Sequence, residues 1–477
     1  MKMQPNRRDL MRSLLSFAGA GVCASEAGAQ SHLPGLPNVG VRADSGLDRT
    51  ESGVGALMPW ADVLWAVTYV SSRGYKSGTG TGLYAIDENL RIRKRHESNG
   101  VYANRLVHTQ SNQVFIGPYA IDMAGNIRVI QDLADVRLTA TMTHLTDPAN
   151  RVYFLSMEGP FYEVDVASLK ARQLADLAKE FAIREQPHFK GAHTGQGRVV
   201  VANNTYTRWN ESEGQLAEWD GKKWNILIRK PFMEAAGRPN LGEVVFATGW
   251  DEASVLFMAL IDGTWKKHRL PKASHAWDQF WQTEWTRIRE VETERFMMDA
   301  HGMFYELSPV PFEKAIWGVR PVCAHLRVIP DYCSFRGLLA LAGNENTPNH
   351  DNNPVGGQPQ SGIWFGKTDD LWQFGKPKGW GGPWRKAPVK AGEASDPFLM
   401  TGFENKVLHL IQHGGASAVR VTIEVDVTGD GSWQKYENVT VPSSGYKYHV
   451  FPPGFSAHWA RVTADADCTA TAEFMYT

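Results

Sequence analysis

The chain has 477 residues, of which 43% are hydrophobic, enough to bury a large core in one large domain or two. Its formal net charge is −1. Setting aside residues 1–29, with four basic and two acidic side chains, takes the charge to −3. The chain therefore has no basic field for nucleic acid, and an acidic ligand would need local Arg or Lys. Seventeen tryptophans and 45 glycines, with few long apolar runs, favour many short strands joined by turns.

Residues 1–29 are typical of an export signal. Asn6-Arg7-Arg8-Asp9-Leu10-Met11 has the pattern of a twin-arginine signal, a weakly apolar stretch follows, and Ala27-Gly28-Ala29 is a cleavage site of the small-x-small type. We expect a periplasmic or extracellular protein, with an ordinary secretory signal as the alternative. No other run approaches the roughly 18 apolar residues of a membrane span, so we expect no membrane insertion.

A repeated strand-turn-strand plan organises the chain after an extended lead-in at residues 30–52. Residues 101–122 show it most clearly, with an apolar residue followed by Asp where a turn is expected. The same mark appears as Ile86-Asp87, Ile121-Asp122, Val164-Asp165, Trp219-Asp220 and Ile261-Asp262. Four-stranded units are predicted at 53–96, 97–133, 134–177, 186–231, 242–272, 283–308 and 323–345. The fold class is therefore all-β, a seven-bladed β-propeller over 53–388, with six or eight blades as alternatives.

The rhythm changes near residue 391. Strictly alternating segments separated by turns predict a small C-terminal β-sandwich over 391–477. Before it, residues 346–388 are rich in Gly, Pro, Asn and Trp, and are expected to hold a long loop and a strand at 362–365 that helps to complete the ring. The run from Asp426 to Gly431 is similar to a calcium loop, but it lacks the distal Glu and is interpreted as a hairpin turn.

Histidines at equivalent places in three successive units are the first candidate site residues. His108, His144 and His193 each stand beside a polar turn. In a propeller such positions form a ring around one end of the channel, where they could supply a general base or hold a metal. The alternative is that each imidazole simply bonds the backbone of its turn.

A second group is expected at the starts of the inner strands or at the next hairpin, on the opposite rim. Aromatic rings beside Arg and Lys suit an acidic sugar, because rings stack on a pyranose face and guanidinium binds a carboxylate. The members are Tyr102, Arg105, Tyr119, His188, Lys190, Asn203, Asn204, Tyr206, His275, Trp285, Arg287 and His301.

Several long motifs resemble one carbohydrate-active family. They are YANRLVHTQSNQVFIGPYAID, HLTDPANRVYF, EVDVASL, HTGQGRVVVANN, RLPKASHAWD, EWTRIRE, MDAHGMF and GQPQSGIW. The family comprises seven-bladed propeller enzymes that act on terminal L-rhamnose linked α-1,4 to D-glucuronic acid in arabinogalactan and gum-type glycans. The resemblance covers most of residues 53–365. The members of this family include both lyases and hydrolases.

The resemblance implies removal of the rhamnose cap by β-elimination. We predict His108 as base with Tyr119 or His144 as acid, and Arg105 or Arg287 as the group that neutralises the glucuronate carboxylate. Tyr102, Lys190, His193, His275 and His301 are predicted to bind substrate. No cofactor is required by this chemistry, although the channel could hold a structural calcium ion.

Two alternatives remain open at this stage. A hydrolase on the same linkage would need a pair of carboxylates about 5–10 Å apart. Glu158, Glu284 and Asp299 are candidates, but they are scattered over different units. A propeller that binds glycans without turnover is the second alternative. In every case the partner is an acidic plant-type glycan with a rhamnose cap.

Overall fold

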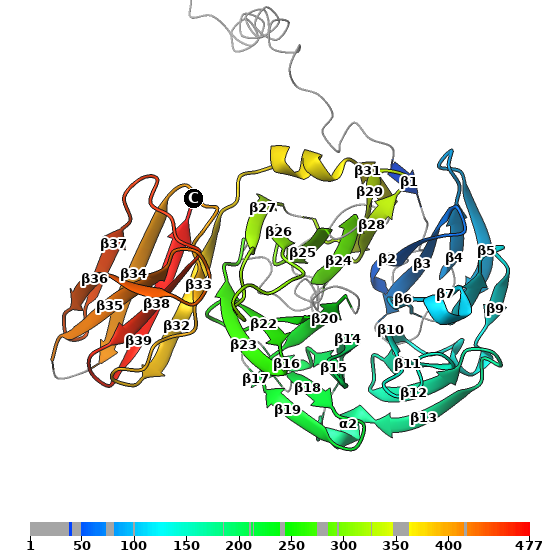
Figure 1. The fold of residues 1–477 in the computed structure, drawn as a ribbon, viewed down its shortest axis with the longest axis horizontal. Coiled ribbons are helices and arrows are strands. Elements are labelled where there is room, and N and C mark those ends of the chain that lie inside the picture. The colour runs from blue at the N-terminus through cyan, green and yellow to red at the C-terminus, as the bar shows by residue number, and fades with distance from the viewer. Residues whose placement is uncertain are drawn as a thin grey trace, which may run out of the picture.

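The computed structural model describes residues 38–40, 49–72, 81–98, 101–184, 186–208, 211–212, 214–238, 244–273, 285–292, 295–325, 327–346, 362–414 and 417–477. Most of its regular structure is β-strand, and several sheets stand around a common centre (Figure 1). This arrangement is a β-propeller. Within the described ranges, no helix combines the length and apolar character needed to cross a membrane.

Each sheet of the ring is an antiparallel meander whose first strand lies innermost (Figure 1). The first sheets are β2 (Arg49–Trp60), β3 (Val63–Ser72), β4 (Thr81–Ile86) and β5 (Ile92–Ser98); β6 (Arg105–His108), β7 (Gln113–Ile116), β8 (Tyr119–Asp122) and β9 (Ile127–Val129); and β10 (Leu138–Thr143), β11 (Arg151–Ser156), β12 (Pro160–Asp165) and β13 (Ala171–Asp176). The short helical turn η2 (Thr109–Ser111) lies between β6 and β7, η3 (Gln131–Leu133) follows β9, and α2 (Leu177–Glu180) follows β13.

The next sheets continue the same plan. They are β14 (Phe189–Gly195), β15 (Arg198–Asn203), β18 (Gln215–Trp219) and β19 (Trp224–Ile228); β20 (Phe232–Gly237), β21 (Val245–Trp250), β22 (Val255–Ile261) and β23 (Thr264–Leu270); and β24 (Arg287–Glu292), β25 (Arg295–Ala300), β26 (Met303–Leu307) and β27 (Arg320–Ala324). A hairpin of β16 (Tyr206–Arg208) and β17 (Glu211–Ser212) is inserted before β18.

The two ends of the ring are joined through strands. In the last sheet, β28 (Tyr332–Phe335) and β29 (Leu338–Ala342) are followed by β31 (Gly362–Gly366) and, on its outer side, β1 (Asn38–Gly40). The segment β30 (Asn344–Asn346) pairs with β2. Part of the predicted lead-in therefore forms an outer strand, and the strand predicted at 362–365 is present.

The Asp that marks each repeat acts as predicted in four of its five places. Asp87, Asp122, Asp165 and Asp220 each accept a hydrogen bond through Oδ1 from the backbone N–H two residues on, at 2.8–3.2 Å. Asp262 differs, because it takes a positive φ of 47° beside Gly263 and forms a two-residue hairpin turn between β22 and β23.

Eight strands follow the ring after η6 (Thr368–Gln373). One sheet contains β32 (Gly379–Val389), β39 (Cys468–Tyr476), β34 (Lys406–Gly414) and β37 (Tyr446–Val450). The other strands, β33 (Phe398–Leu399), β38 (Trp459–Ala464), β35 (Val419–Asp426) and β36 (Trp433–Val441), continue the sheet of β20–β23 through the pairing of β23 with β33. The buried side chains of both sets of strands share one core, in which the Phe398 and Phe474 rings stack at 5.0 Å. Because β32 pairs with β39, this part begins before the predicted boundary at 391.

The C-terminal sheets are attached to the ring. Arg269 of β23 pairs with Phe398 of β33 in parallel, and the Trp459 indole N–H donates to the Ile316 carbonyl at 2.9 Å. The run that is similar to a calcium loop lies between β35 and β36. Asp426 accepts there from the N–H groups of Gly429 and Gly431, both at 2.8 Å, which supports its interpretation as a turn.

Gly55 lies where two neighbouring segments of the ring come very close together. A Cβ built on Gly55 would lie 1.9 Å from the Tyr102 carbonyl oxygen. We expect Gly55→Ala to lower the free energy of unfolding by about 1–3 kcal/mol, because a backbone must move to admit the methyl group. Gly414→Ala is the control, since its Cβ would meet nothing within 4 Å. Urea unfolding of both variants measures the difference, and equal midpoints would contradict the packing described here.

Candidate functional site

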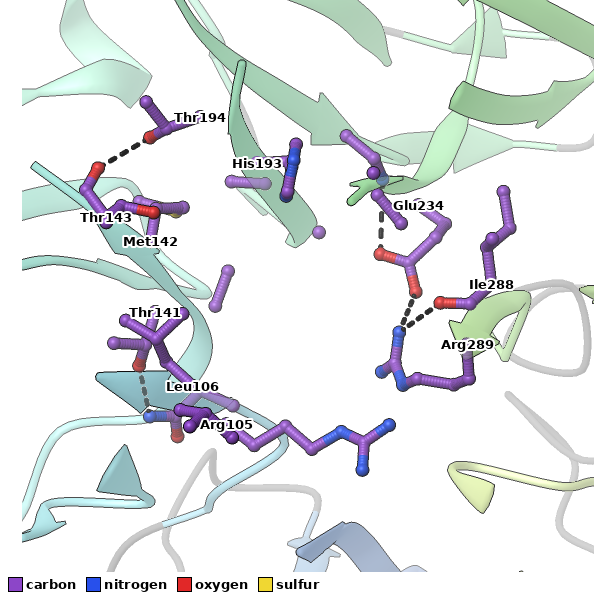
Figure 2. A pocket seen from close by; sticks show the side chains of 18 of the residues that line it. Arg105, Leu106, Thr141, Met142, Thr143, His193, Thr194, Glu234, Ile288 and Arg289 are labelled. Carbon is purple, nitrogen blue, oxygen red and sulfur yellow. Dashed lines mark hydrogen bonds and ion pairs between the residues drawn. The ribbon is translucent and has the colours of Figure 1, made fainter. Parts of the chain in front are cut away.

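A cavity of about 590 Å³ lies at the centre of the ring. Its walls come mainly from the innermost strands β6, β10, β14, β20 and β24, and β2 adds Met58, so six sheets contribute to one space. Figure 2 shows Thr141, His193, Glu234 and Arg289 around its opening, with the Arg105 side chain extending across one side. Close contact of β14 with β20 depends on Gly191, where a Cβ would lie 2.8 Å from Glu234 Oε1.

The cavity carries an excess of positive charge. Among the described residues that line it, Arg105, Lys190, Arg238, Arg287 and Arg289 are cationic, whereas Glu234 and Glu290 are the carboxylates. Five positive and two negative charges leave +3, or +2 when Asp331, buried directly behind the wall, is included. This local balance contrasts with the net charge of −1 for the whole chain.

A buried ion-pair network accounts for part of this charge. Arg289 donates from Nε to Asp331 Oδ1 at 2.6 Å and from Nη1 to Glu234 Oε2 at 2.9 Å. Arg105 Nε lies 3.3 Å from Asp331 Oδ2, which also accepts from the Leu57 N–H at 2.7 Å. Burial alone would raise the pKa of Asp331, but Arg105 and Arg289 outweigh it and hold that pKa below its ordinary value. Burial alone would lower the pKa of Arg289, and its two carboxylate partners raise it.

Arg287 is held differently. It is almost fully buried, donates to the Pro330 and Thr286 carbonyls at 2.8 and 2.9 Å, and lies 3.8 Å from Glu234. Its Nη2 has no hydrogen-bond partner among the residues that the structure describes. Burial lowers the pKa of this guanidinium more than Glu234 restores it. Arg287 is therefore the least neutralised cation of the ion-pair network.

Trp285 brings a second cation close to Arg287. The Lys190 ammonium lies 4.7 Å from the centre of the indole ring and the Arg287 guanidinium lies 5.1 Å from it. The Tyr69 ring stacks on the same indole at 4.9 Å. Both cations line the cavity, whereas Trp285 is buried and lies outside its described lining. The indole therefore supports two cations at the cavity wall.

The imidazoles of His108 and His144 accept hydrogen bonds from the backbone of their own turns. His108 Nε2 lies 2.7 Å from the Pro148 carbonyl, so it carries the proton, and Nδ1 accepts from the Ser111 N–H at 3.3 Å. His144 Nδ1 accepts from the N–H groups of Thr146 and Asp147, and Nε2 donates to Glu163 at 2.9 Å. This geometry favours the alternative interpretation of both residues, because neither imidazole keeps a free lone pair for a substrate proton.

The structure does not bring His108, His144 and Tyr119 together at the cavity. His144 lines it, whereas His108 and Tyr119 are absent from its described lining. Tyr119 packs edge-on against Tyr102 at 6.1 Å, and burial raises the pKa of Tyr119, which opposes a role as an acid with a lowered pKa. Tyr102 donates to the Ala134 carbonyl and also lies outside the described lining.

His193 is the remaining imidazole at the cavity. Its side chain projects from β14 into the cavity (Figure 2) and makes no hydrogen bond to another described residue. Burial lowers the pKa of His193 to about 4, so the ring is neutral at neutral pH. Of the three histidines in the predicted ring, this one has nitrogens available to a ligand.

Two other predicted substrate contacts lie elsewhere. His275 falls outside the described residues. His301 takes a positive φ of 49° in the turn between β25 and β26, where it packs against the Trp250 ring at 6.3 Å. It is buried away from the described cavity lining, and burial keeps its pKa well below the ordinary value.

The carboxylates considered for hydrolysis do not form a pair at the cavity. Glu158 is bound to Arg137, and Asp299 lies 3.0 Å from His325 Nε2. Glu284 lies outside the described residues. Within the described part of the chain, no group of three or more His, Cys, Asp or Glu side chains is placed to hold a metal ion. Cys323 and Cys333 are both free thiols.

Sequence reasoning missed Glu234, Arg289 and Asp331. Arg287 and Arg289 are two residues apart in β24, a spacing that places both side chains on one side of a strand and could have indicated Arg289. Glu234 was missed because the fifth unit was predicted to begin at 242, whereas its first strand is β20. Asp331 precedes a strand and no local pattern singles it out.

Comparison with known proteins finds similarity among solved structures alone. No protein-family model matches the chain, and no curated protein matches it. Among solved structures, it is similar to the β-propeller domain of Myceliophteria thermophila Cps50 (Swd1), at 12% identity and a TM-score of 0.39, over 61% of this chain and 94% of that one. It is also similar to the β-propeller domain of the trilobed protease from Pyrococcus furiosus, at 8% identity and a TM-score of 0.34, over 67% and 98% of the two chains. PorZ of Porphyromonas gingivalis matches at 11% identity and a TM-score of 0.37, over 80% and 45%.

The network around Asp331 yields a stability prediction. Asp331→Asn keeps the shape of the side chain and removes the charge that Arg105 and Arg289 share. We expect a loss of about 3–5 kcal/mol in the free energy of unfolding at neutral pH, because buried guanidinium groups lose their counter-charge. Since the pKa of Asp331 is depressed, its contribution is present above the ordinary carboxyl pKa and disappears as the pH falls into the acid range.

Glu404→Gln is the matched control for Asp331→Asn. Glu404 forms an exposed ion pair with Lys376 at 2.8 Å, and its loss should leave the unfolding midpoint unchanged. Equal midpoints for the two variants would mean that the central network does not hold the ring together.

Proposed function

We propose that this chain is an exported enzyme that removes terminal L-rhamnose from α-1,4-linked D-glucuronic acid by β-elimination. In this proposal the ring is a seven-bladed propeller, the C-terminal sheets form an appended β-sandwich, and residues 1–29 are the twin-arginine signal. The supporting observation is the cationic central cavity in a chain of slightly negative net charge. Such a cavity attracts an anionic ligand, and a uronate supplies the anion and a pyranose ring together.

Arg287 is the proposed anchor for the glucuronate carboxylate. Its guanidinium is buried, incompletely neutralised and beside the cavity. A carboxylate bound there would gain charge-assisted hydrogen bonds and would repay part of the desolvation of the guanidinium. The neighbouring Lys190 supplies a second cation, and both cations lie over the buried Trp285 ring. Neutralising the carboxylate acidifies the hydrogen on C5 of the uronate.

His193 is proposed as the base in place of His108. It would take the C5 proton, the electron pair would form the C4–C5 double bond, and the C4–O4 bond would break. Rhamnose leaves with O4, which must gain a proton. In a glucuronate the C5 hydrogen and O4 are gauche, on the same side of the C4–C5 bond, so the imidazolium can return its proton to O4. One histidine can thus serve as base and acid, and the step requires no cofactor.

The depressed pKa of His193 sets the expected pH dependence. In the free enzyme this pKa is about 4, so the imidazole is already neutral at pH 5 to 7. We expect kcat/KM for rhamnose release to fall only as the pH drops toward about 4, well below the ordinary pKa of about 6.5. Tryptophan fluorescence recorded at each pH separates this titration from acid unfolding.

His193→Asn tests the assignment of the base. We expect rhamnose release to fall by about 100-fold or more, because the proton acceptor is lost. Binding of the disaccharide, measured by calorimetry, should change only a few-fold. His108→Asn is the matched variant: it should weaken the turn that its imidazole bonds and leave kcat largely intact. If His108→Asn abolishes turnover while folding and binding survive, and His193→Asn does not, the base is His108 and this assignment is wrong.

A further inference from the structure

The sheet β32–β39–β34–β37 leaves a patterned aromatic face uncovered. Its edge strand β37 lies at the side of the C-terminal sheets away from the ring (Figure 1). Tyr446 and Tyr448 are 50% and 59% exposed, and Val450 and Met475 are also exposed. Large side chains normally gather on a surface in this way where something binds.

Strand register places nine side chains on this one face, because residues directly opposite one another in neighbouring strands share a face. They lie in three rows across β37, β34 and β39: Tyr446, Ile411 and Thr471; Tyr448, His409 and Glu473; Val450, Val407 and Met475. The other face of the same strands carries Leu408, Leu410 and Phe474, which belong to the buried core. The aromatic face therefore lies outside the buried core of these sheets.

The aromatic rings are held in place before any ligand arrives. Tyr446 and His409 lie with an angle of 15° between their planes and centroids 6.0 Å apart, and the Tyr446 hydroxyl bonds His409 Nδ1 at 2.8 Å. Tyr446 and Tyr448 are 27° from parallel at 6.1 Å. Tyrosines fixed in this manner lose little conformational entropy on binding, and their hydroxyl groups add hydrogen bonds at the edge of the apolar surface.

The size and charge of the face point to its occupant. A stable dimer buries about 20–30 residues on each side, far more than nine. Only one of the nine, Glu473, is a charged side chain, so β37, β34 and β39 present no cation on this face. On the fourth strand, β32, Arg385 lies 5.5 Å from the Trp380 ring, which stands opposite Met475. Near-parallel rings interspersed with hydroxyl, imidazole and carboxylate groups match the faces of pyranose rings, which present C–H groups flat and hydroxyl groups around the edge.

We propose that this face, defined by Tyr446, Tyr448 and His409, binds a neutral polysaccharide chain. The site is separate from the central cavity, and its existence does not rest on the proposed lyase activity. It would retain the protein on the neutral backbone of a glycan, whereas the cationic cavity takes the acidic end group. The aromatic face would thus hold the polymer, and the cationic cavity would carry out the proposed reaction.

Affinity electrophoresis of the full mature chain in gels containing neutral galactan, xylan, arabinan or glucan tests the proposal. We expect at least one of these neutral polymers to retard the protein more than polygalacturonate does, because Glu473 repels a polyanion. Tyr448→Ala should weaken that retardation about tenfold, and Tyr448→Phe should keep most of it. Phe312→Ala, which removes an exposed ring elsewhere, should change nothing.

Three results would overturn the proposal: no retardation by any neutral polymer, retardation that Tyr448→Ala leaves intact, or a dimer in sedimentation that Tyr448→Ala dissociates. Thermal unfolding of each variant establishes that the fold is intact. Rhamnose release from a rhamnosyl-glucuronate disaccharide, measured in parallel, should be the same in Tyr448→Ala and the unmodified protein. Loss of the polymer interaction is thereby distinguished from failure of the proposed activity.

Discussion

The carboxylate of Asp331, fully buried beside two guanidinium groups, is the constraint on which the centre of this propeller depends. Asp331 precedes β28, and its partners come from β6 and β24, while the Leu57 N–H of β2 binds the same carboxylate. Arg289 then extends the network to Glu234 of β20. Sheets arranged in a ring pack mainly against their neighbours, so a network that joins strands of four sheets to the residue before a fifth fixes their relative positions.

Networks of this kind are costly to bury and are weak evidence for stability in themselves. Here the network also sets the chemistry of the cavity. Asp331 lies within 3.3 Å of Arg105 and Arg289, and Glu234 within 2.9 Å of Arg289, whereas the carboxylate nearest to Arg287 in the network is Glu234 at 3.8 Å. Burial lowers the pKa of both Arg105 and Arg287. The same interactions that position the inner strands thus leave one guanidinium able to bind an anion, and this connects the packing of the ring to its proposed substrate.

Much of the fold could be predicted because its signals are local. The turn-forming Asp residues and the alternating strands lie within a few residues of one another, and Asp87, Asp122, Asp165 and Asp220 bond their turns as expected. The outer strand β1 was missed because its partner β31 lies more than 300 residues away in the sequence. The start of the fifth unit was predicted too late in the chain. Its first strand, β20, pairs with β21, but the sequence between them lacks the apolar-Asp pattern that marks the other turns.

The candidate site was harder to predict because its residues lie far apart in the sequence. Repeats reuse a residue at equivalent places, and His108 and His144 occur together because both bond a turn, which sequence alone does not distinguish from a ligand-binding ring. Glu234, Arg289 and Asp331 come from strands far apart in the chain, so only the closed ring shows that they meet. Arg105, Lys190, His193 and Arg287 were predicted as site residues, with His193 on the opposite rim from the other three, and the structure brings all four to one cavity.

The most direct test follows both products of the mature protein acting on a rhamnosyl-α-1,4-glucuronate oligosaccharide. Free rhamnose and the ultraviolet absorbance of an unsaturated uronate would be recorded on the same sample. Elimination at the cationic cavity predicts that the two rise together in equal amounts. Rhamnose released without absorbance would mean hydrolysis, and no release of rhamnose would mean that the cavity does not act on this linkage; either result would contradict the account.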